Sequence, residues 1–271
     1  MTQDAKLANA LARLKDCQGI LAEYQGALRE GLRLSEQEDD VPAVMLQRAF
    51  DFGVRTISAA LVLMQDGDRH SVFVSIVCRP FYELSTRLLW ATRAPGGWQR
   101  LQAYWASEDM KWAREAETMP PLDAHARAVG AARQEVLART DPGGEVYSPA
   151  PVVQQLLQEI QAHDLAEGIQ DRGSDAAAFN YANVYRILCR GAHAHMAAIA
   201  PEKPEAVVLH AATAVVLATW MLVQAFLHVA AADPKKEIEV VGRRFIEIMR
   251  KTQEAGPASS DRPTSENQEK A

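Results

Sequence analysis

The sequence predicts an all-α fold, a multi-helix bundle of about eight helices with a long, buried, Ala-rich helix near the C-terminus. Three observations support this prediction. Apolar residues recur at the three- and four-residue spacing of helices, the two-residue alternation of strands is nearly absent, and residues 207–232 include no Asp, Glu, Lys or Arg. Hydrophobic residues make up 48% of the 271 positions and charged residues 24%, so the chain has ample apolar side chains for a core.

The first three helices are predicted from regular apolar stripes. The first stripe consists of Leu7, Leu11, Leu14, Ile20 and Leu21, and it ends near the acidic turn SEQEDDVP. Pro42 in that turn suits the first turn of the next helix. The second stripe comprises Val54, Ile57, Leu61 and Met64, and after the break DGD the third comprises Phe73, Ile76, Val77, Phe81, Leu84 and Leu88. We expect the second and third helices to form an antiparallel hairpin.

Proline and glycine residues divide the middle of the chain. Pro95-Gly96-Gly97 predicts the end of the third helix, and an aromatic-rich helix follows until Pro120-Pro121. A further helix is expected over 124–139 and ends before the loop DPGGEVYSPAP.

Four more segments complete the predicted order. An amphipathic helix begins at about residue 152, and the turn-like HDLAEGIQDRGSD precedes a helix over about 176–198. Two prolines then introduce the long apolar helix, and Pro234 separates it from a charged last helix over 238–249. We interpret residues 1–251 as a single all-helical domain and 252–271 as a disordered tail without packing side chains.

Charge and cysteine content restrict the class of protein. Twenty-nine Lys and Arg against 35 Asp and Glu give a net charge of -6, which argues against nucleic-acid binding through overall charge but leaves a local basic site open. Cys17, Cys78 and Cys189 are far apart and form no C-x-x-C pair, so neither a disulfide framework nor a zinc knuckle is indicated. The N-terminal segment has no continuous apolar core of a signal peptide. A cytoplasmic location is therefore expected.

The charge-free stretch 207–232 raises the alternative of a membrane span, because its length suffices to cross a bilayer. It is rich in Ala, however, and it contains the polar residues His210, Thr213, Thr219, Gln224 and His228. Spanning helices rely mainly on Leu, Ile, Val and Phe. We therefore expect a buried central helix and no membrane span.

The first candidate site lies in the third predicted helix, in the segment Arg79-Pro80-Phe81-Tyr82-Glu83. Pro80 interrupts the helical hydrogen bonding inside an otherwise continuous stripe, and a kink is expected there. Arg79 and Glu83 are four residues apart, so they can pair with each other or with groups on another helix. A solvent-facing ion pair is the plainer interpretation, because Arg79 lies away from the apolar stripe on the helical wheel.

The second candidate segment runs from Tyr185 to His195. On a regular helix Arg186, Arg190 and His193 share one face, whereas His195 falls back among the apolar residues. Two guanidinium groups beside an imidazole suit an anionic ligand such as a phosphodiester, since Arg offers forked donors and His exchanges a proton near neutral pH. The alternative for Arg186, Arg190 and His193 is that they form the solvent-exposed face of an amphipathic helix. The alternative for His195 is a core histidine that is hydrogen-bonded to a neighbour.

Neither a metal nor a nucleotide cofactor is expected. Residues at i and i+2, such as His193 and His195, point about 200° apart on a helix, and no second cluster of ligands occurs at recognisable spacing. His163, His210 and His228 remain as possible remote contributors. The sequence also lacks the glycine-rich phosphate loops and the G-x-S-x-G elbow of hydrolases.

The helix SIVCRPFYELSTRLLW and the later YRILCRGAHAH together resemble the bacterial family catalogued as domain of unknown function 5677 and its relatives. The resemblance covers about half the chain and points to Arg79, Glu83 and His193, since that family has an R-P-x-x-E-type helix and a late helical histidine. The family usually has serine where this chain has Cys189. It has no established activity.

A more distant likeness is to the HEPN nucleases of prokaryotic defence and toxin systems, whose signature is Arg, four to six residues, then His. Arg190 to His195 and Arg186 to His193 both satisfy that spacing, and only the second pair shares a helix face. The resemblance implies a ribonuclease that needs no metal, in which histidine moves the proton of the 2′-hydroxyl and arginine stabilises charge on the phosphate.

Two functional hypotheses follow. The first is a HEPN-like RNA-cleaving or RNA-binding homodimer. Its catalytic residues would be Arg186, Arg190, His193 and Glu83, and its substrate-binding residues would be Arg79, Tyr185 and His195. The second is a noncatalytic protein-interaction module in which an Arg-Glu-His polar network is structural. The proposed site requires that the helix of Glu83 packs beside the helix of His193.

Overall fold

The computed structural model describes residues 2–35, 41–65, 69–119, 123–140, 153–167, 180–192, 204–231 and 233–250. Within these ranges it contains nine α-helices, one π-helical turn and no β-strand, which confirms the all-α multi-helix fold. The helices are α1 (Gln3–Ser35), α2 (Val41–Leu63), α3 (Ser71–Arg93), α4 (Gly97–Ala116), α5 (Asp123–Thr140), α6 (Val153–Ala166), α8 (Arg186–Ala192), α10 (Pro204–Ala230) and α11 (Pro234–Arg250), and the π-helical turn is η1 (Tyr181–Tyr185).

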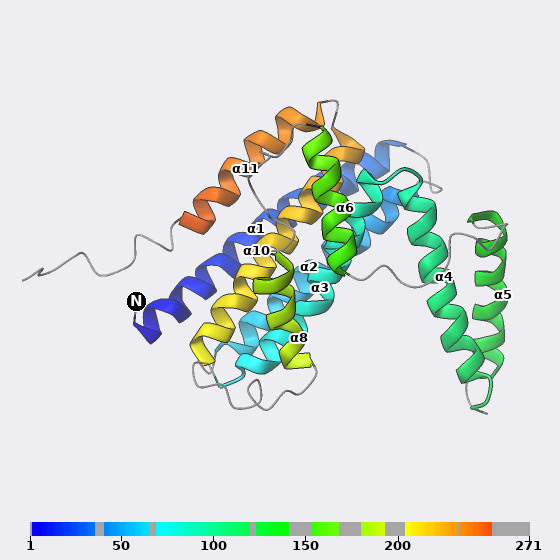
Figure 1. The fold of residues 1–271 in the computed structure, drawn as a ribbon, viewed down its shortest axis with the longest axis horizontal. Helices are drawn as coiled ribbons and strands as arrows, with labels where there is room; N and C mark the ends of the chain where they lie inside the picture. Colours follow the sequence, from blue (N-terminus) through cyan, green and yellow to red (C-terminus); the bar gives the residue numbers. More distant parts are fainter. Residues whose placement is uncertain are drawn as a thin grey trace, which may run out of the picture.

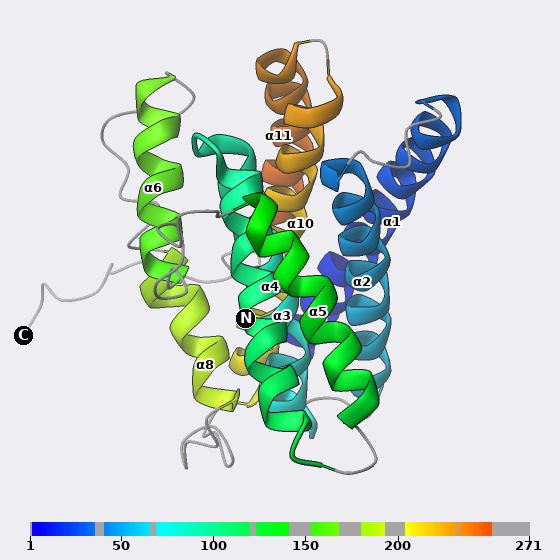
Figure 2. The same ribbon diagram turned by 90° about the vertical axis from the view of Figure 1, so that its right-hand side faces the viewer.

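Helix α10 is the centre of the bundle. It packs against α1 and α3, with α2 and α11 as further neighbours (Figures 1 and 2). Fifteen of its 27 residues are buried, and many are alanines, whose small side chains let the surrounding helices approach closely. The helix is long and apolar enough to cross a membrane, yet 61% of its most apolar window is already buried against the described residues. This burial confirms the predicted central helix.

Helices α2 and α3 form the predicted antiparallel hairpin and contribute much of the core. Phe50 and Ile57 from α2 and Phe81 and Leu88 from α3 are fully buried. Gly53 lies where α1, α2 and α3 meet, and a Cβ at this position would come within 2.7 Å of the Phe81 ring and 2.8 Å of Leu21. The close approach of the three helices therefore requires glycine.

A tight corner joins α3 to α4. Gly96 adopts the left-handed conformation with φ of 62°, and Gly97 begins α4 so near to α3 that a Cβ would lie 2.6 Å from the carbonyl oxygen of Ala91. The sequence Pro95-Gly96-Gly97 thus ends α3 as predicted, because the first glycine supplies the turn and the second the close approach.

Helices α4 and α5 form a second hairpin at the side of the bundle (Figure 1). The first turns of α4 reach the main core through Leu101. Farther out, the hairpin has a small separate cluster of Ala113, Ala116 and Ala126, and Ala126 is the buried residue of α5. The main core, by contrast, extends from Ala10 to Ile248.

The predicted helix over about 176–198 is described only for residues 180–192. There the chain forms the π-helical turn η1 followed by the short helix α8, rather than one regular α-helix. The predicted disordered tail, 252–271, lies outside the described residues.

Candidate functional site

The first polar cluster of the site is built on one face of α3. Arg79 donates a hydrogen bond from Nε to Oε1 of Glu83 over 2.8 Å, and Arg87 Nη1 lies 3.9 Å from Oε2 of the same carboxylate. Each of these side chains is about one fifth exposed. Positions four apart on a helix face one another, so the three residues follow one line along α3. The pair is therefore half-buried and not the solvent-facing ion pair that is the plainer interpretation of the sequence.

Tyr185, at the end of η1, joins this cluster from the opposite part of the chain. Its hydroxyl donates to Glu83 Oε1 over 2.9 Å, and its ring lies under the Arg79 guanidinium, 5.7 Å from Cζ to the ring centroid. The ring also stacks on Tyr82, with centroids 6.1 Å apart and an interplanar angle of 24°. The helix of Glu83 and the helix that begins at Arg186 therefore pack side by side, as the contacts between α3 and α8 also show.

The electrostatics of this cluster favour the protonated forms of Tyr185 and Arg79. Burial, hydrogen bonding with Cys189 and Glu83, and the nearby Glu83 charge all raise the pKa of the Tyr185 hydroxyl, so it stays protonated and donates. Burial lowers the pKa of Arg79, but the hydrogen bond to Glu83 and the neighbouring Cys189 and Tyr185 outweigh it, so the net shift is upward. A protonated donor and a permanent cation thus meet one carboxylate.

The π-helical turn η1 changes the register in which α8 presents its side chains. A π turn contains more residues than an α turn, and such turns are frequent at functional sites. Tyr185 is the last residue of η1, and Cys189, one turn later in α8, is half-buried and interacts with it. Arg186 is exposed on a different face of the same helix.

The predicted site residues are therefore only partly brought together. Arg79, Glu83 and Tyr185 form one cluster, whereas Arg186 does not contact it within the described interactions. Arg190 belongs to α8, but its side chain lies outside the described part of the structure. His193 and His195 also lie outside the described residues, so their proposed roles remain predictions.

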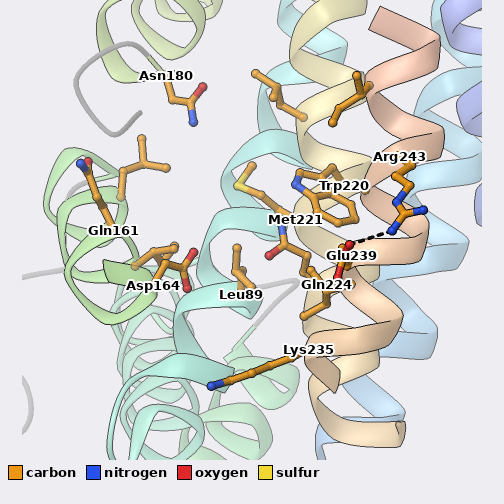
Figure 3. Close-up of a pocket in the computed structure, with 16 residues that line it drawn as sticks. Leu89, Gln161, Asp164, Asn180, Trp220, Met221, Gln224, Lys235, Glu239 and Arg243 are labelled. Atoms are coloured by element: carbon orange, nitrogen blue, oxygen red, sulfur yellow. Dashed lines mark hydrogen bonds and ion pairs between the residues drawn. The ribbon is translucent and has the colours of Figure 1, made fainter. Parts of the chain in front are cut away.

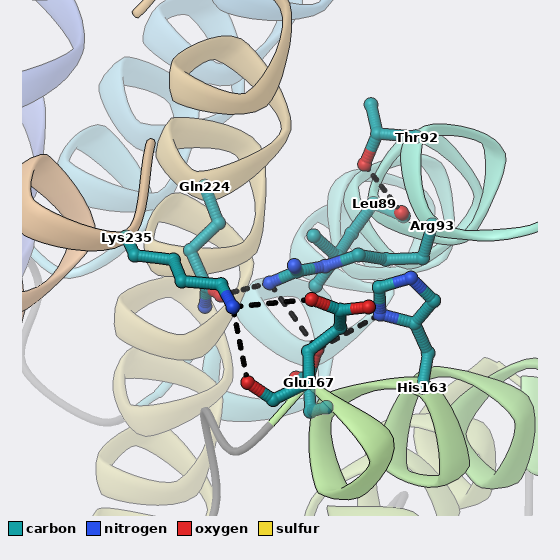
Figure 4. Close-up of polar contacts among 8 residues, drawn as sticks. Leu89, Thr92, Arg93, His163, Glu167, Gln224 and Lys235 are labelled. Carbon is teal, nitrogen blue, oxygen red and sulfur yellow. Dashed lines mark hydrogen bonds and ion pairs between the residues drawn. The ribbon is translucent and has the colours of Figure 1, made fainter. Parts of the chain in front are cut away.

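A second polar cluster, centred on Arg93 at the end of α3, was not predicted from the sequence (Figure 4). The Arg93 side chain is 2% exposed. Its Nη2 donates to Gln224 Oε1 over 3.3 Å and lies 3.2 Å from Asp164 Oδ1, an ion-pair distance without hydrogen-bond geometry. The other guanidinium nitrogens, Nε and Nη1, have no hydrogen-bond partner among the described residues. A buried guanidinium is therefore only partly satisfied.

Ionisable neighbours of Arg93 respond to the same burial. Burial raises the pKa of Asp164 although Arg93 and His163 lower it, and burial together with Arg93 and His163 lowers the pKa of His228 to about 4. One feature of the sequence could have indicated this cluster. Gln224 and His228 stand one turn apart in an otherwise apolar helix, and buried polar groups require partners.

A cavity of about 750 Å³ opens beside this second cluster, between α3, α6, α10 and α11. Trp220 and Met221 form part of its wall, and Asp164, Gln224 and Lys235 lie towards one end (Figure 3). Lys235 is also held by Glu167, with Nζ 3.1 Å from Oε2. The cavity therefore has an apolar wall and a polar end of mixed charge.

Within the part of the chain that the structure describes, no three His, Cys, Asp or Glu residues lie close enough together to hold a metal ion. Comparison with known proteins adds no further assignment: no family model, no curated protein and no solved structure matches this chain.

Proposed function

We propose that this chain is a HEPN-like cytoplasmic protein that cleaves or binds RNA without a metal ion, acts as a homodimer, and places its site where α3 meets η1 and α8. The observation that supports this proposal best is the hydrogen bond from Tyr185 to Glu83, because it joins the helix of Arg79 and Glu83 to the segment that carries the HEPN-like spacing of Arg and His. Arg79 and Arg87 add two cations beside the carboxylate, and Arg186 follows Tyr185 directly.

The chemistry assigned to this site is transesterification of the RNA backbone. The 2′-oxygen attacks phosphorus, the bond from phosphorus to the 5′-oxygen breaks, and the products are a 2′,3′-cyclic phosphate and a free 5′-hydroxyl. His193 would take the proton from the 2′-hydroxyl and return it to the leaving 5′-oxygen. Arg186 and Arg190 would stabilise charge on the phosphate, while Glu83 and Tyr185 hold the two helices in register.

The test compares purified wild-type protein with His193→Ala and Glu83→Gln on end-labelled single-stranded RNA, with and without EDTA. We expect the wild type to cleave RNA equally in both buffers. Both variants should lose at least tenfold in rate, His193→Ala through removal of the general acid-base and Glu83→Gln through misplacement of the two helices. His210→Ala is the matched control, because His210 is an exposed histidine whose ring nitrogen contacts the Ala206 carbonyl of its own helix. The proposal is overturned if wild type and His193→Ala both fail to cleave and bind RNA equally poorly.

The second candidate function is a noncatalytic protein-interaction module in which the same cluster is structural. It is favoured by the way Arg79, Glu83 and Tyr185 satisfy one another across two helices. Under this alternative, Glu83→Ala lowers the melting temperature by several degrees, while no RNA activity exists to be lost. An active wild type that is inactivated by His193→Ala without loss of melting temperature excludes this alternative.

A further inference from the structure

A second cavity, of about 630 Å³, lies on another side of α11, between α1, α10 and α11. Its walls are mainly the apolar side chains Leu209, Val216, Leu217, Trp220, Phe245 and Met249. The contact between α10 and α11 is narrow, because only Ile238, Phe245 and Ile248 of α11 are buried. The cavity is therefore an apolar groove beside a thinly packed helix and is separate from the Glu83 cluster.

One end of this groove is cationic. Arg13 lines it with only 7% of the residue exposed, and its Nη1 donates to Thr213 Oγ1 over 2.7 Å. Arg250, at the exposed end of α11, is a second lining cation, and Asn9, one turn before Arg13, adds a buried amide. None of the described residues that line this groove is acidic. The polar end therefore complements a negative charge.

Burial strengthens that complementarity. A guanidinium among apolar groups interacts with an anion at an effective dielectric well below that of water. Burial also lowers the pKa of Arg13, with Cys17 acting in the opposite direction.

The rest of the groove suits an apolar chain. Thr213, the partner of Arg13, precedes Trp220 by seven residues of α10, which corresponds to about 10 Å along the helix axis. At Trp220 the groove meets the cavity of Figure 3, since Leu217, Trp220, Gly242 and Ile246 line both. Gly242 leaves space over the indole, where a Cβ would lie 3.4 Å from Trp220 Cη2.

We propose that this groove binds an amphiphile with an anionic head group and a flexible apolar chain. The head group lies at Arg13 and Arg250, and the chain runs along α10 towards Trp220 and Gly242. A free fatty acid and the acyl chain of an anionic phospholipid share this chemistry, and the experiment separates these two sources.

The first arm measures binding of laurate, below its micellar concentration, to the full-length protein by calorimetry. Dodecyltrimethylammonium, which has the same chain with a positive head group, is the matched probe. We expect saturable binding of one laurate per protein and at least tenfold weaker binding of the cation. Equal binding of the two probes, or no binding of laurate together with no binding to vesicles, overturns the proposal.

Three variants locate the site. Arg250→Gln should weaken laurate binding about five- to tenfold through loss of a charge-assisted contact. Gly242→Leu should abolish binding of the chain by filling the space beside Trp220, and Leu209→Trp narrows the other end if Gly242→Leu does not fold. Arg244→Gln is the control, because Arg244 is on the same helix but pairs with Glu23 and lines neither cavity. An equal loss in Arg244→Gln contradicts the assignment.

The second arm measures co-sedimentation with phosphatidylglycerol vesicles. Vesicle binding that Arg250→Gln and Gly242→Leu weaken identifies membrane phospholipid as the source of the acyl chain. Vesicle binding that neither variant changes, in a protein that does not bind laurate, overturns the proposal. The Glu83 and His193 variants are expected to bind laurate as the wild type does. A failure of the laurate test therefore leaves the RNA proposal intact, and a failure of the RNA test leaves the laurate proposal intact.

Discussion

Tyr185 donates a hydrogen bond to Glu83 across 102 positions of sequence, and this contact joins α3 to the segment formed by η1 and α8. Glu83 already accepts from Arg79, so its carboxylate links two donors on two helices. A network of this kind stabilises the protein only while all its members are present, because each removal leaves a half-buried polar group without its partner.

This relationship predicts strong coupling between Tyr185 and Glu83. In a double-mutant cycle with Tyr185→Phe and Glu83→Gln, we expect a coupling energy of about 1–2 kcal/mol, since the hydrogen bond involves a charged acceptor. Urea unfolding followed by circular dichroism measures it. Additive effects of the two substitutions would show that the contact does not hold the helices together.

Asp164 is expected to be essential for stability because it faces the buried Arg93. Asp164→Ala leaves the guanidinium without its counter-ion and should reduce the free energy of unfolding by about 3–5 kcal/mol. Glu239→Ala is the control, as its ion pair with Arg243 is about three-quarters exposed and should contribute less than about 0.5 kcal/mol. A cost for Asp164→Ala no greater than for the control contradicts the role of this pair.

The lowered pKa of His228 should make the stability of the protein depend on pH in a specific range. This pKa is lowered to about 4 by burial, Arg93 and His163, from an unfolded value near 6.5. Between these values the unfolded chain binds the proton and the folded chain does not, so stability is full above pH 6.5 and falls as the pH drops towards 4. At about 1.4 kcal/mol per pKa unit, the shift corresponds to a loss of about 3.5 kcal/mol, an upper bound that solvent screening of this partly exposed side chain reduces. The slope of unfolding free energy against pH should be smaller in His228→Gln; identical slopes would contradict this cause.

Two glycines in helices should respond to alanine in opposite ways. Gly53→Ala forces a Cβ against Phe81 and Leu21 and should destabilise the protein by about 1–3 kcal/mol. Gly19 is exposed in α1, and nothing lies within 4 Å of the Cβ that alanine would add, so Gly19→Ala should stabilise by about 0.5–1 kcal/mol. Thermal melts of both variants check the pair, and a stabilising Gly53→Ala would show that the three helices separate easily.

Local sequence patterns were sufficient to predict the helices. The absence of charge over 207–232 indicated α10, and Pro95-Gly96-Gly97 indicated the corner before α4, because periodicity and turn chemistry act within a few residues. The pairing of helices was harder to predict. Nothing near Glu83 in the sequence specifies Tyr185 as its partner.

The second limit on prediction was the helical register, which sets the direction in which each side chain points. A uniform 100° step over 176–198 takes no account of η1, whose π turn shifts the angular position of the side chains of α8 relative to the residues before Tyr181. The Arg93 cluster was hidden for a related reason. Its members come from α3, α6 and α10, and each looks like an ordinary polar residue within its own helix.

Beyond the first turns of α4, the hairpin of α4 and α5 packs on its own small alanine cluster, separate from the main core, with an Arg133–Asp109 ion pair and a Trp112–His125 ring contact between the two helices. Its length is therefore not tied to the packing of the other helices. We expect that whole turns can be removed from, or added to, the outer parts of both helices in matched numbers at little energetic cost to the bundle. The surface of the hairpin can therefore vary in sequence and in length, whereas the central helices are constrained by their close packing.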